Sequence, residues 1–420
     1  MVSNKYIDRS IQKGFLKGVT GCLEHTFSLY ELLRNARESA RQIVVTWIDL
    51  ANAYGSIMHN LVQFALDWYH VPLGIRWIIF SYYEQLFAMV VTANWQTDFF
   101  PYDIGLFQGC VMSTILFDIT FDLLLDYLKC YDHLGYSLRK PVSVQAMCKA
   151  YADDLTIITG WVKNNQIILN RIGAWLSWTR TMRAKPTKCK TLATSKIAKE
   201  KRLIMEPHTK NVYTTFDPQL LIDSQPIPAL GPTTMELDDR FKFPGRVLSH
   251  DLKEKLQELL VTEAFNARMS LIDRDLVNGL MKVWIYQFYV VPTLAWPFQM
   301  YDFPLDLAKQ LDRTAVCFLK KWTDIFKRAD NGVLFGARDR LGLGLTSPSS
   351  LLMQMQVLKC HIIKHSKEGP DGPLRKLYLR RLEKENKIVR GWKPCPTLEE
   401  AEAKLEFDLK FAGQRDKAGH

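Results

Sequence analysis

The stretch "AYADDLTI", residues 150–157, sets two adjacent carboxylates, Asp153 and Asp154, between apolar residues that are typical of buried strands. Burying a charge is costly unless an opposite charge lies against it. The apolar residues on either side divide into two strands, so we expect a β-hairpin with the acidic pair at its tip. Any fold that this chain adopts must place that tip where both charges are compensated.

A second apolar stretch, "IVVTWIDL" (43–50), predicts another strand buried on both faces, with Asp49 near its end. If this strand neighbours the hairpin, three carboxylates meet at one end of a sheet, and divalent metal ions are the natural compensation. The competing interpretation is that Asp153 and Asp154 only cap a turn, as adjacent aspartates often do. The apolar flanks and the third carboxylate favour the metal site.

Helical and extended segments alternate over the first half of the chain. Helices are predicted at 21–40, 57–69, 73–87, 111–130 and 165–182, and further strands at 88–95 and 189–196. This order describes an α+β fold, in which helices pack on a sheet. Residues 206–239 are rich in proline, threonine and aspartate and indicate irregular structure or a boundary, and from about 251 the pattern is mainly helical.

Two apolar segments carry further expectations. Within the helix at 111–130, Asp118, Asp122 and Asp126 recur every four residues, which predicts one polar face on an otherwise buried helix. The run at 283–298 is too short to cross a bilayer and is interrupted by prolines, so we interpret it as protein core and expect no membrane contact.

The charge balance favours polyanionic partners. Lysine and arginine outnumber aspartate and glutamate 55 to 44, which gives a formal net charge of +11. Two basic stretches, 180–202 and 375–393, are candidates for contact with a nucleic-acid backbone, although such runs are also typical of solvated faces. The eight cysteines are scattered without a CxxC pair and the N-terminus is polar, so we expect an intracellular protein, in the nucleus or the cytoplasm.

Five short blocks in order resemble a known family. "VVTWIDLANAYGSI", "LFQGCVMSTILF" and "AYADDLTI" together are similar to the palm of a reverse transcriptase, most closely those of retrotransposons that lack long terminal repeats. "KPTKCKTL" and "RFKFPGRVLS" match the next two blocks of that family, with "KFPGR" where a leucine-glycine pair is usual. The resemblance implies a right-hand polymerase: a remnant of fingers at 1–42, an antiparallel palm at 43–250, and a helical thumb and C-terminal region at 251–420.

The same resemblance implies a metal-binding catalytic group. Asp49, Asp153 and Asp154 would hold two Mg²⁺ ions, with Mn²⁺ as a possible substitute, and the carbonyl of Leu50 would be an extra ligand. Lys188, in "KPTKC", matches a lysine that lies near the triphosphate and donates a proton to the leaving group. A solvated surface lysine is the competing interpretation of Lys188.

Further residues would bind the substrate. Asn52 and Ala53 would offer backbone N–H groups to the incoming triphosphate, and Tyr54 occupies the position whose ring excludes a 2′-hydroxyl. Gln108 would contact template or nucleotide, and Gly109 would allow a close approach of backbone and substrate. The alternatives are a core tyrosine at Tyr54 and a simple helix-start turn at the other two.

The implied activity is that of an RNA-directed DNA polymerase, which extends a DNA primer on an RNA template with deoxynucleoside triphosphates. The alternative is a catalytically silent descendant that binds RNA or hybrid duplex through its basic surface. The alternative is motivated by the short fingers, because only 48 residues precede Asp49 and the fingers of this family normally begin further upstream. A partner chain that supplies an endonuclease is a further expectation.

Overall fold

The computed structural model describes residues 7–384 apart from 17–18, 139–143, 186–187, 197–202, 206–220, 223–224, 227–232, 235–240, 244–245, 249–251, 253, 367 and 369–371. Every predicted site residue is therefore described. Most of the predicted boundary region at 206–239, and the basic residues at 197–202 and 385–393, lie outside the described part. Contacts divide the chain into two compact units, residues 1–241 with 370–376 and residues 242–369 with 377–420.

The first unit is built on an antiparallel sheet around one central strand. β1 (Val44–Ile48) lies between β7 (Asp154–Thr159) and β8 (Lys190–Lys196), and β6 (Cys148–Tyr151) lies on the other side of β7. The pairs β8–β1, β1–β7 and β7–β6 are all antiparallel. Two short strands, β9 (Leu203–Met205) and β12 (Thr233–Thr234), pair with β8. Every residue of β1 is buried, as its β-branched and aromatic composition predicts.

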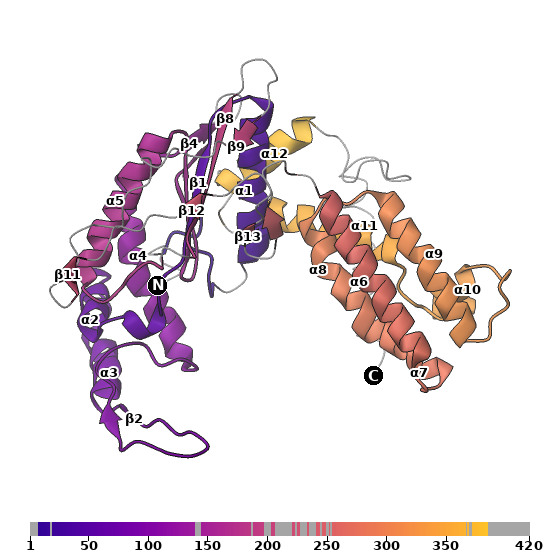
Figure 1. The fold of residues 1–420 in the computed structure, drawn as a ribbon, viewed down its shortest axis with the longest axis horizontal. Coiled ribbons are helices and arrows are strands. Elements are labelled where there is room, and N and C mark those ends of the chain that lie inside the picture. Colours follow the sequence, from indigo (N-terminus) through magenta and orange to yellow (C-terminus); the bar gives the residue numbers. More distant parts are fainter. Residues whose placement is uncertain are drawn as a thin grey trace. The chain divides into compact units, whose positions relative to one another are not determined.

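Helices cover both faces of this sheet (Figure 1). The helices of the unit are α1 (Gly21–Glu38), α2 (His59–Trp68), α3 (Leu73–Glu84), α4 (Val111–Lys129) and α5 (Val162–Thr179). Each lies within a few residues of its predicted range. Residues of α2, α4 and α5 share one buried apolar core with β1, β6 and β7, and that core fixes the end of the sheet where the acidic residues lie.

The predicted strand at 88–95 is wrong. The segment instead forms a small two-stranded sheet of β2 (Phe87–Ala88) and β3 (Phe100–Pro101), joined by exposed residues. A second small pair consists of β4 (Tyr136–Leu138) and β5 (Val144–Ala146). The apolar residues of "AMVVTANW" satisfy the strand pattern, but none of the described strands of the main sheet pairs with them, so they stay near the surface.

The aspartate face of α4 is also a correction. Asp118 and Asp122 are 3% and 0% exposed, because their face of the helix packs against protein and not water. The hydroxyl of Tyr69 donates hydrogen bonds to Asp122 (2.6 Å) and Asp126 (3.0 Å). Burial, and secondarily the neighbouring Asp122, raises the pKa of Asp118 to about 8, and burial raises the pKa of Asp122 to about 7. Sequence spacing alone does not distinguish a wet polar face from a buried one.

The second unit is mainly helical, as predicted. Its helices are α6 (Lys255–Arg274), α7 (Gly279–Ile285), a π-helical segment (Tyr286–Val290), α8 (Val291–Met300), α9 (Leu305–Trp322), α10 (Gly332–Phe335), α11 (Pro348–Lys364) and the second part of α12 (Pro373–Lys384). The run at 283–298 is core on one face only: Tyr286 and Phe298 are buried, whereas Trp284 and Phe288 are exposed. Within the described residues, no helix is both long and apolar enough to span a membrane.

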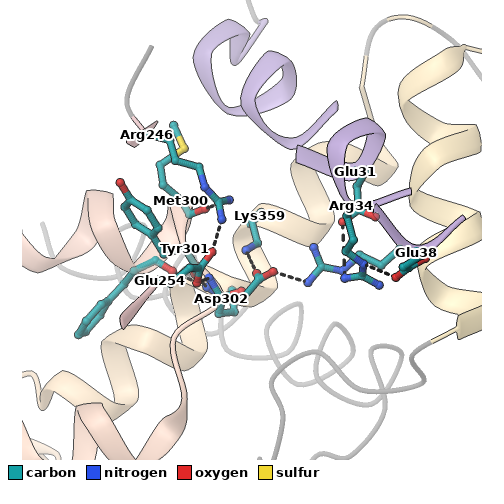
Figure 2. A network of polar contacts seen from close by, with 12 residues as sticks. Glu31, Arg34, Glu38, Arg246, Glu254, Met300, Tyr301, Asp302 and Lys359 are labelled. Carbon is teal, nitrogen blue, oxygen red and sulfur yellow. Dashed lines mark hydrogen bonds and ion pairs between the residues drawn. The ribbon is translucent and has the colours of Figure 1, made fainter. Parts of the chain in front are cut away.

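An ionic network stabilises this helical unit (Figure 2). Lys359 Nζ lies 2.5 Å from Asp302 Oδ1, and Arg381 Nη2 lies 2.8 Å from Asp302 Oδ2. Arg246 pairs with Glu254, whose second oxygen accepts a hydrogen bond from the Asp302 backbone N–H at 2.8 Å. Burial acts to raise the pKa of Asp302, but the surrounding cations, Arg381 first among them, hold it well below its usual range.

Candidate active site

The acidic pair lies at the tip of a tight hairpin, as predicted. Tyr151 of β6 pairs with Asp154 of β7, which leaves Ala152 and Asp153 as a two-residue turn. Ala152 has a φ of 54°, in the left-handed region that a residue with a side chain rarely adopts. The first turn residue of such hairpins often needs a positive φ and is usually glycine, so the alanine here must be held in place.

The register of the sheet brings the third carboxylate to the same end. The last paired residues of β1 and β7 are Ile48 and Leu155. Asp49 is the next residue along β1, and Asp154 is the next along the antiparallel β7, so the two come to the same end of the strand pair. The predicted neighbourhood of the two strands is therefore present in the structure, with β1 and β7 directly hydrogen-bonded.

The backbone around Asp49 is fixed by the segment that precedes β8. The N–H of Lys185 donates to the Asp49 carbonyl (2.8 Å), and the N–H of Ala51 donates to the Arg183 carbonyl (2.8 Å). Leu50 lies opposite Ala184, between these two hydrogen bonds. In an antiparallel pair, successive residues point their backbone groups alternately toward and away from the partner strand, so the Leu50 carbonyl points away from Ala184. The Leu50 carbonyl therefore does not take part in this bridge.

The carboxylates repel one another, and one lysine offsets part of the charge. Desolvation first, and then Asp153 and Asp49, raise the pKa of Asp154 to about 6, and similar causes raise the pKa of Asp153. Lys188 Nζ lies 3.6 Å from Asp49 Oδ2 and lowers both values. Among the residues that the structure describes, no three His, Cys, Asp or Glu side chains lie in an arrangement that would hold a metal ion as they stand.

The segment after Asp49 forms a compact turn with free backbone donors. Asn52 has a φ of 46°, and its carbonyl accepts a hydrogen bond from the Ser56 N–H at 2.9 Å. Neither the N–H of Asn52 nor that of Ala53 donates a backbone hydrogen bond to another described residue. Asn52 is exposed and Ala53 is buried, so the structure supports access of a ligand to Asn52 but not to Ala53.

The ring of Tyr54 is held against the core. It stacks on Phe117 of α4, with ring centroids 4.6 Å apart and an angle of 12° between the planes. Its hydroxyl is buried without a hydrogen-bond partner among the described residues, and burial, followed by Asp118 and Asp153, raises its pKa to about 12. The packing of the ring fits a core tyrosine, and the role of Tyr54 in excluding a 2′-hydroxyl stays a prediction.

Gln108 and Gly109 lie in the turn before α4. Gly109 has a φ of 97° and open space on its Cβ side, and Gln108 is exposed. The preceding residues join this turn to the Tyr54 segment, since the Leu106 N–H donates to the Tyr54 carbonyl at 2.8 Å. The structure therefore connects the turn to the site through its backbone, and it shows no contact between Gln108 and the three aspartates.

Two residues that the sequence did not single out support the site. Cys189 is fully buried, and its sulfur accepts a hydrogen bond from the Asp49 N–H at 3.4 Å. Phe117 is fully buried beneath Tyr54. Cys189 directly follows Lys188 in the block "KPTKCKTL", so its position in the sequence pointed to the site. Nothing in the local sequence separates Phe117 from the other apolar residues of its helix.

The fold and the site define an α+β protein that gathers acidic residues, backbone donors and a lysine at one end of an antiparallel sheet. Residues 5–232 match the family model described as reverse transcriptase (RNA-dependent DNA polymerase), which is more than half of the chain. The chain therefore belongs to the reverse transcriptase family. The resemblance found in the sequence blocks is confirmed.

Two curated relatives come from retrotransposable elements. The chain is 25% identical over 253 residues to the Retrovirus-related Pol polyprotein from type-2 retrotransposable element R2DM of Drosophila melanogaster, which covers 59% of this chain and 22% of the relative. It is 27% identical over 188 residues to that from type-1 retrotransposable element R2 of Nasonia vitripennis, which covers 45% and 18%. The chain thus spans about a fifth of the length of these relatives.

A telomerase structure from Candida albicans, in complex with a fragment of telomeric RNA, also matches. It is 8% identical, with a TM-score of 0.32, and the match covers 90% of this chain and 56% of that one. This likeness is too distant to bear on the details of the fold.

Proposed function

We propose that this chain is an RNA-directed DNA polymerase that extends the 3′-hydroxyl of a DNA primer with deoxynucleoside triphosphates on an RNA template. The observation that supports this most is the β1–β7 register, which brings Asp49 to the end of the sheet where Asp153 of the turn and Asp154 of β7 lie. Membership of the reverse transcriptase family supports the same activity. Both curated relatives are Pol polyproteins of retrotransposable elements.

The donors at this end of the sheet are of the chemical type that a hard divalent cation prefers, although their side chains would have to converge to bind one. Asp49, Asp153 and Asp154 supply carboxylate oxygens, and Leu50 supplies a carbonyl outside the bridge to Ala184, which are the ligand types that Mg²⁺ prefers. The chemistry that two such ions would supply here is activation of the attacking hydroxyl and stabilisation of the leaving pyrophosphate. Mn²⁺, which accepts the same oxygen ligands, is the expected substitute.

The remaining site residues position the nucleotide. The free N–H group of Asn52 would bind phosphate oxygens, and Lys188 would neutralise the triphosphate and donate a proton to the departing pyrophosphate. Tyr54, fixed on Phe117, would exclude a 2′-hydroxyl. Gln108 and Gly109, exposed before α4, would contact the template or the nucleotide.

The finer architecture follows the same proposal. The sheet unit would be the palm with part of the fingers, and the helical unit would be the thumb and C-terminal region. The basic net charge of +11 would hold an RNA template and DNA primer. An endonuclease on a partner chain, and a nuclear or cytoplasmic location, stay predictions.

Primer extension tests the proposal. We would incubate the chain with an RNA template, a DNA primer, deoxynucleotides and Mg²⁺, beside Asp153→Asn/Asp154→Asn and the control Asp98→Asn, which alters an exposed aspartate near β3. We expect extension by wild type and control and none by the double variant. Template–primer binding that persists without any wild-type extension would instead support the silent nucleic-acid-binding descendant.

A further inference from the structure

The segment before α1 lies against the catalytic hairpin. Gln12 forms a parallel bridge with Ala150 of β6, which lies 138 residues later in the sequence. The Ala150 N–H donates to the Ile11 carbonyl at 2.8 Å, and the Lys13 N–H donates to the Ala150 carbonyl at 3.0 Å. These bonds fix residues 11–13 beside the strand that leads into the acidic turn.

The side chain of Gln12 binds the turn itself. Its Nε2 donates to the Ala152 carbonyl at 3.1 Å, and its Oε1 accepts from the Ala152 N–H at 2.9 Å. The same oxygen accepts from the Gly14 N–H at 2.8 Å. Gln12 is fully buried, so water does not compete for these bonds. One amide thus holds both backbone groups of the residue that precedes Asp153.

Ala152 is the residue of the turn that most needs such support. Its φ of 54° costs free energy for a residue with a side chain, and such conformations persist when the surroundings determine them strongly. Gly14 shows how close the support comes, because a Cβ on Gly14 would lie 2.4 Å from the Ala152 nitrogen. Only glycine allows the segment to approach the turn in this way.

We propose that Gln12 is a positioning residue that holds the Ala152 turn, and through it keeps Asp153 and Asp154 at the end of the sheet where Asp49 lies. This inference rests on the proposed polymerase function for its catalytic consequence. Its structural part does not, because the hydrogen bonds to Ala152 are formed whatever the chain does. Gln12 itself touches neither metal nor substrate.

The test compares Gln12→Met with the wild-type chain. Methionine has a similar length but makes neither hydrogen bond to Ala152, so the turn loses its support. We expect the amides of residues 150–155 to exchange with deuterium about tenfold faster. We also expect a roughly tenfold lower kcat and a higher Mg²⁺ concentration for half-maximal rate, with an unchanged KM for template–primer.

Gln356→Met is the matched control. Gln356 is also buried, and its Nε2 donates to two backbone carbonyls, those of Phe298 (2.5 Å) and Tyr301 (2.6 Å), in the helical unit. Its substitution removes comparable bonds without touching the hairpin. We expect it to lower thermal stability while exchange at 150–155 and the Mg²⁺ dependence stay at wild-type values.

Several outcomes would overturn the inference. Unchanged exchange at 150–155 in Gln12→Met would do so, as would a loss of kcat of the same size in Gln356→Met. If Gln12→Met does not fold, Gln12→Asn, which shortens the side chain by one methylene, takes its place under the same criteria. If wild type shows no extension, the proposed function fails, and the exchange comparison alone decides whether Gln12 holds the turn.

Discussion

The buried carboxyl of Asp118 gives stability a pH dependence that a single substitution removes. Burial raises its pKa from 3.8 to about 8 in the folded chain. Between these values the unfolded chain has released the proton while the folded chain keeps it, so folding becomes less favourable as pH rises. One proton corresponds to a loss of about 1.4 kcal/mol of unfolding free energy per pH unit. This loss is absent below about pH 4 and complete above about pH 8.

Asp118→Asn should remove this slope. Relative to wild type, we expect the unfolding free energy of the variant to rise by about 3 kcal/mol between about pH 5 and about pH 7. Urea titration read by amide exchange of α4 gives the sheet unit its own unfolding free energy at each pH. Asp98→Asn, at an exposed site, should follow the wild-type slope. Parallel pH profiles for Asp118→Asn and wild type would refute the argument that a buried, protonated carboxyl is present.

Three further substitutions test other parts of the account. Tyr54→Val should raise incorporation of ribonucleotides relative to deoxynucleotides in primer extension, and an unchanged ratio would make Tyr54 a core residue only. Lys188→Ala should lower kcat roughly a hundredfold through loss of the proton donor, whereas a wild-type kcat would assign the lysine to the surface. Asp302→Asn should destabilise the helical unit by about 3 kcal/mol, since it leaves Lys359 and Arg381 without their carboxylate, and calorimetry that detects no shift would contradict this.

The sequence predicts those parts of the site that depend on local patterns. The apolar stretches on either side of Asp153 and Asp154 indicate the hairpin, and the nearly all-apolar strand before Asp49 indicates a strand buried on both faces. Both follow from the composition of buried strands and the cost of burying charge. The helices of the sheet unit are likewise predicted within a few residues, because their length and apolar spacing are strong signals, whereas for the helical unit the sequence predicts only a mainly helical pattern.

The remaining features depend on contacts between distant segments. The spacing of Asp118 and Asp122 fits a wet face as well as a buried one, and only the packing of α4 decides between them. Strand 88–95 has the right composition but no partner in the main sheet. Gln12 lies in none of the five sequence blocks, and its contacts with the turn are seen only when residue 12 is placed beside residue 152. Periodicity describes a segment by itself, so it does not report such contacts.

The central claim is that Asp49, Asp153 and Asp154 act as one metal-binding group, and a double-substitution cycle tests it most directly. Mg²⁺-dependent primer extension would be measured for wild type, Asp49→Asn, Asp153→Asn and the combined variant, with template–primer binding followed in parallel. Residues that act as a unit show strongly non-additive effects, so each single substitution should abolish nearly as much activity as both together. Additive losses, or metal-dependent extension that survives in the combined variant, would contradict the claim.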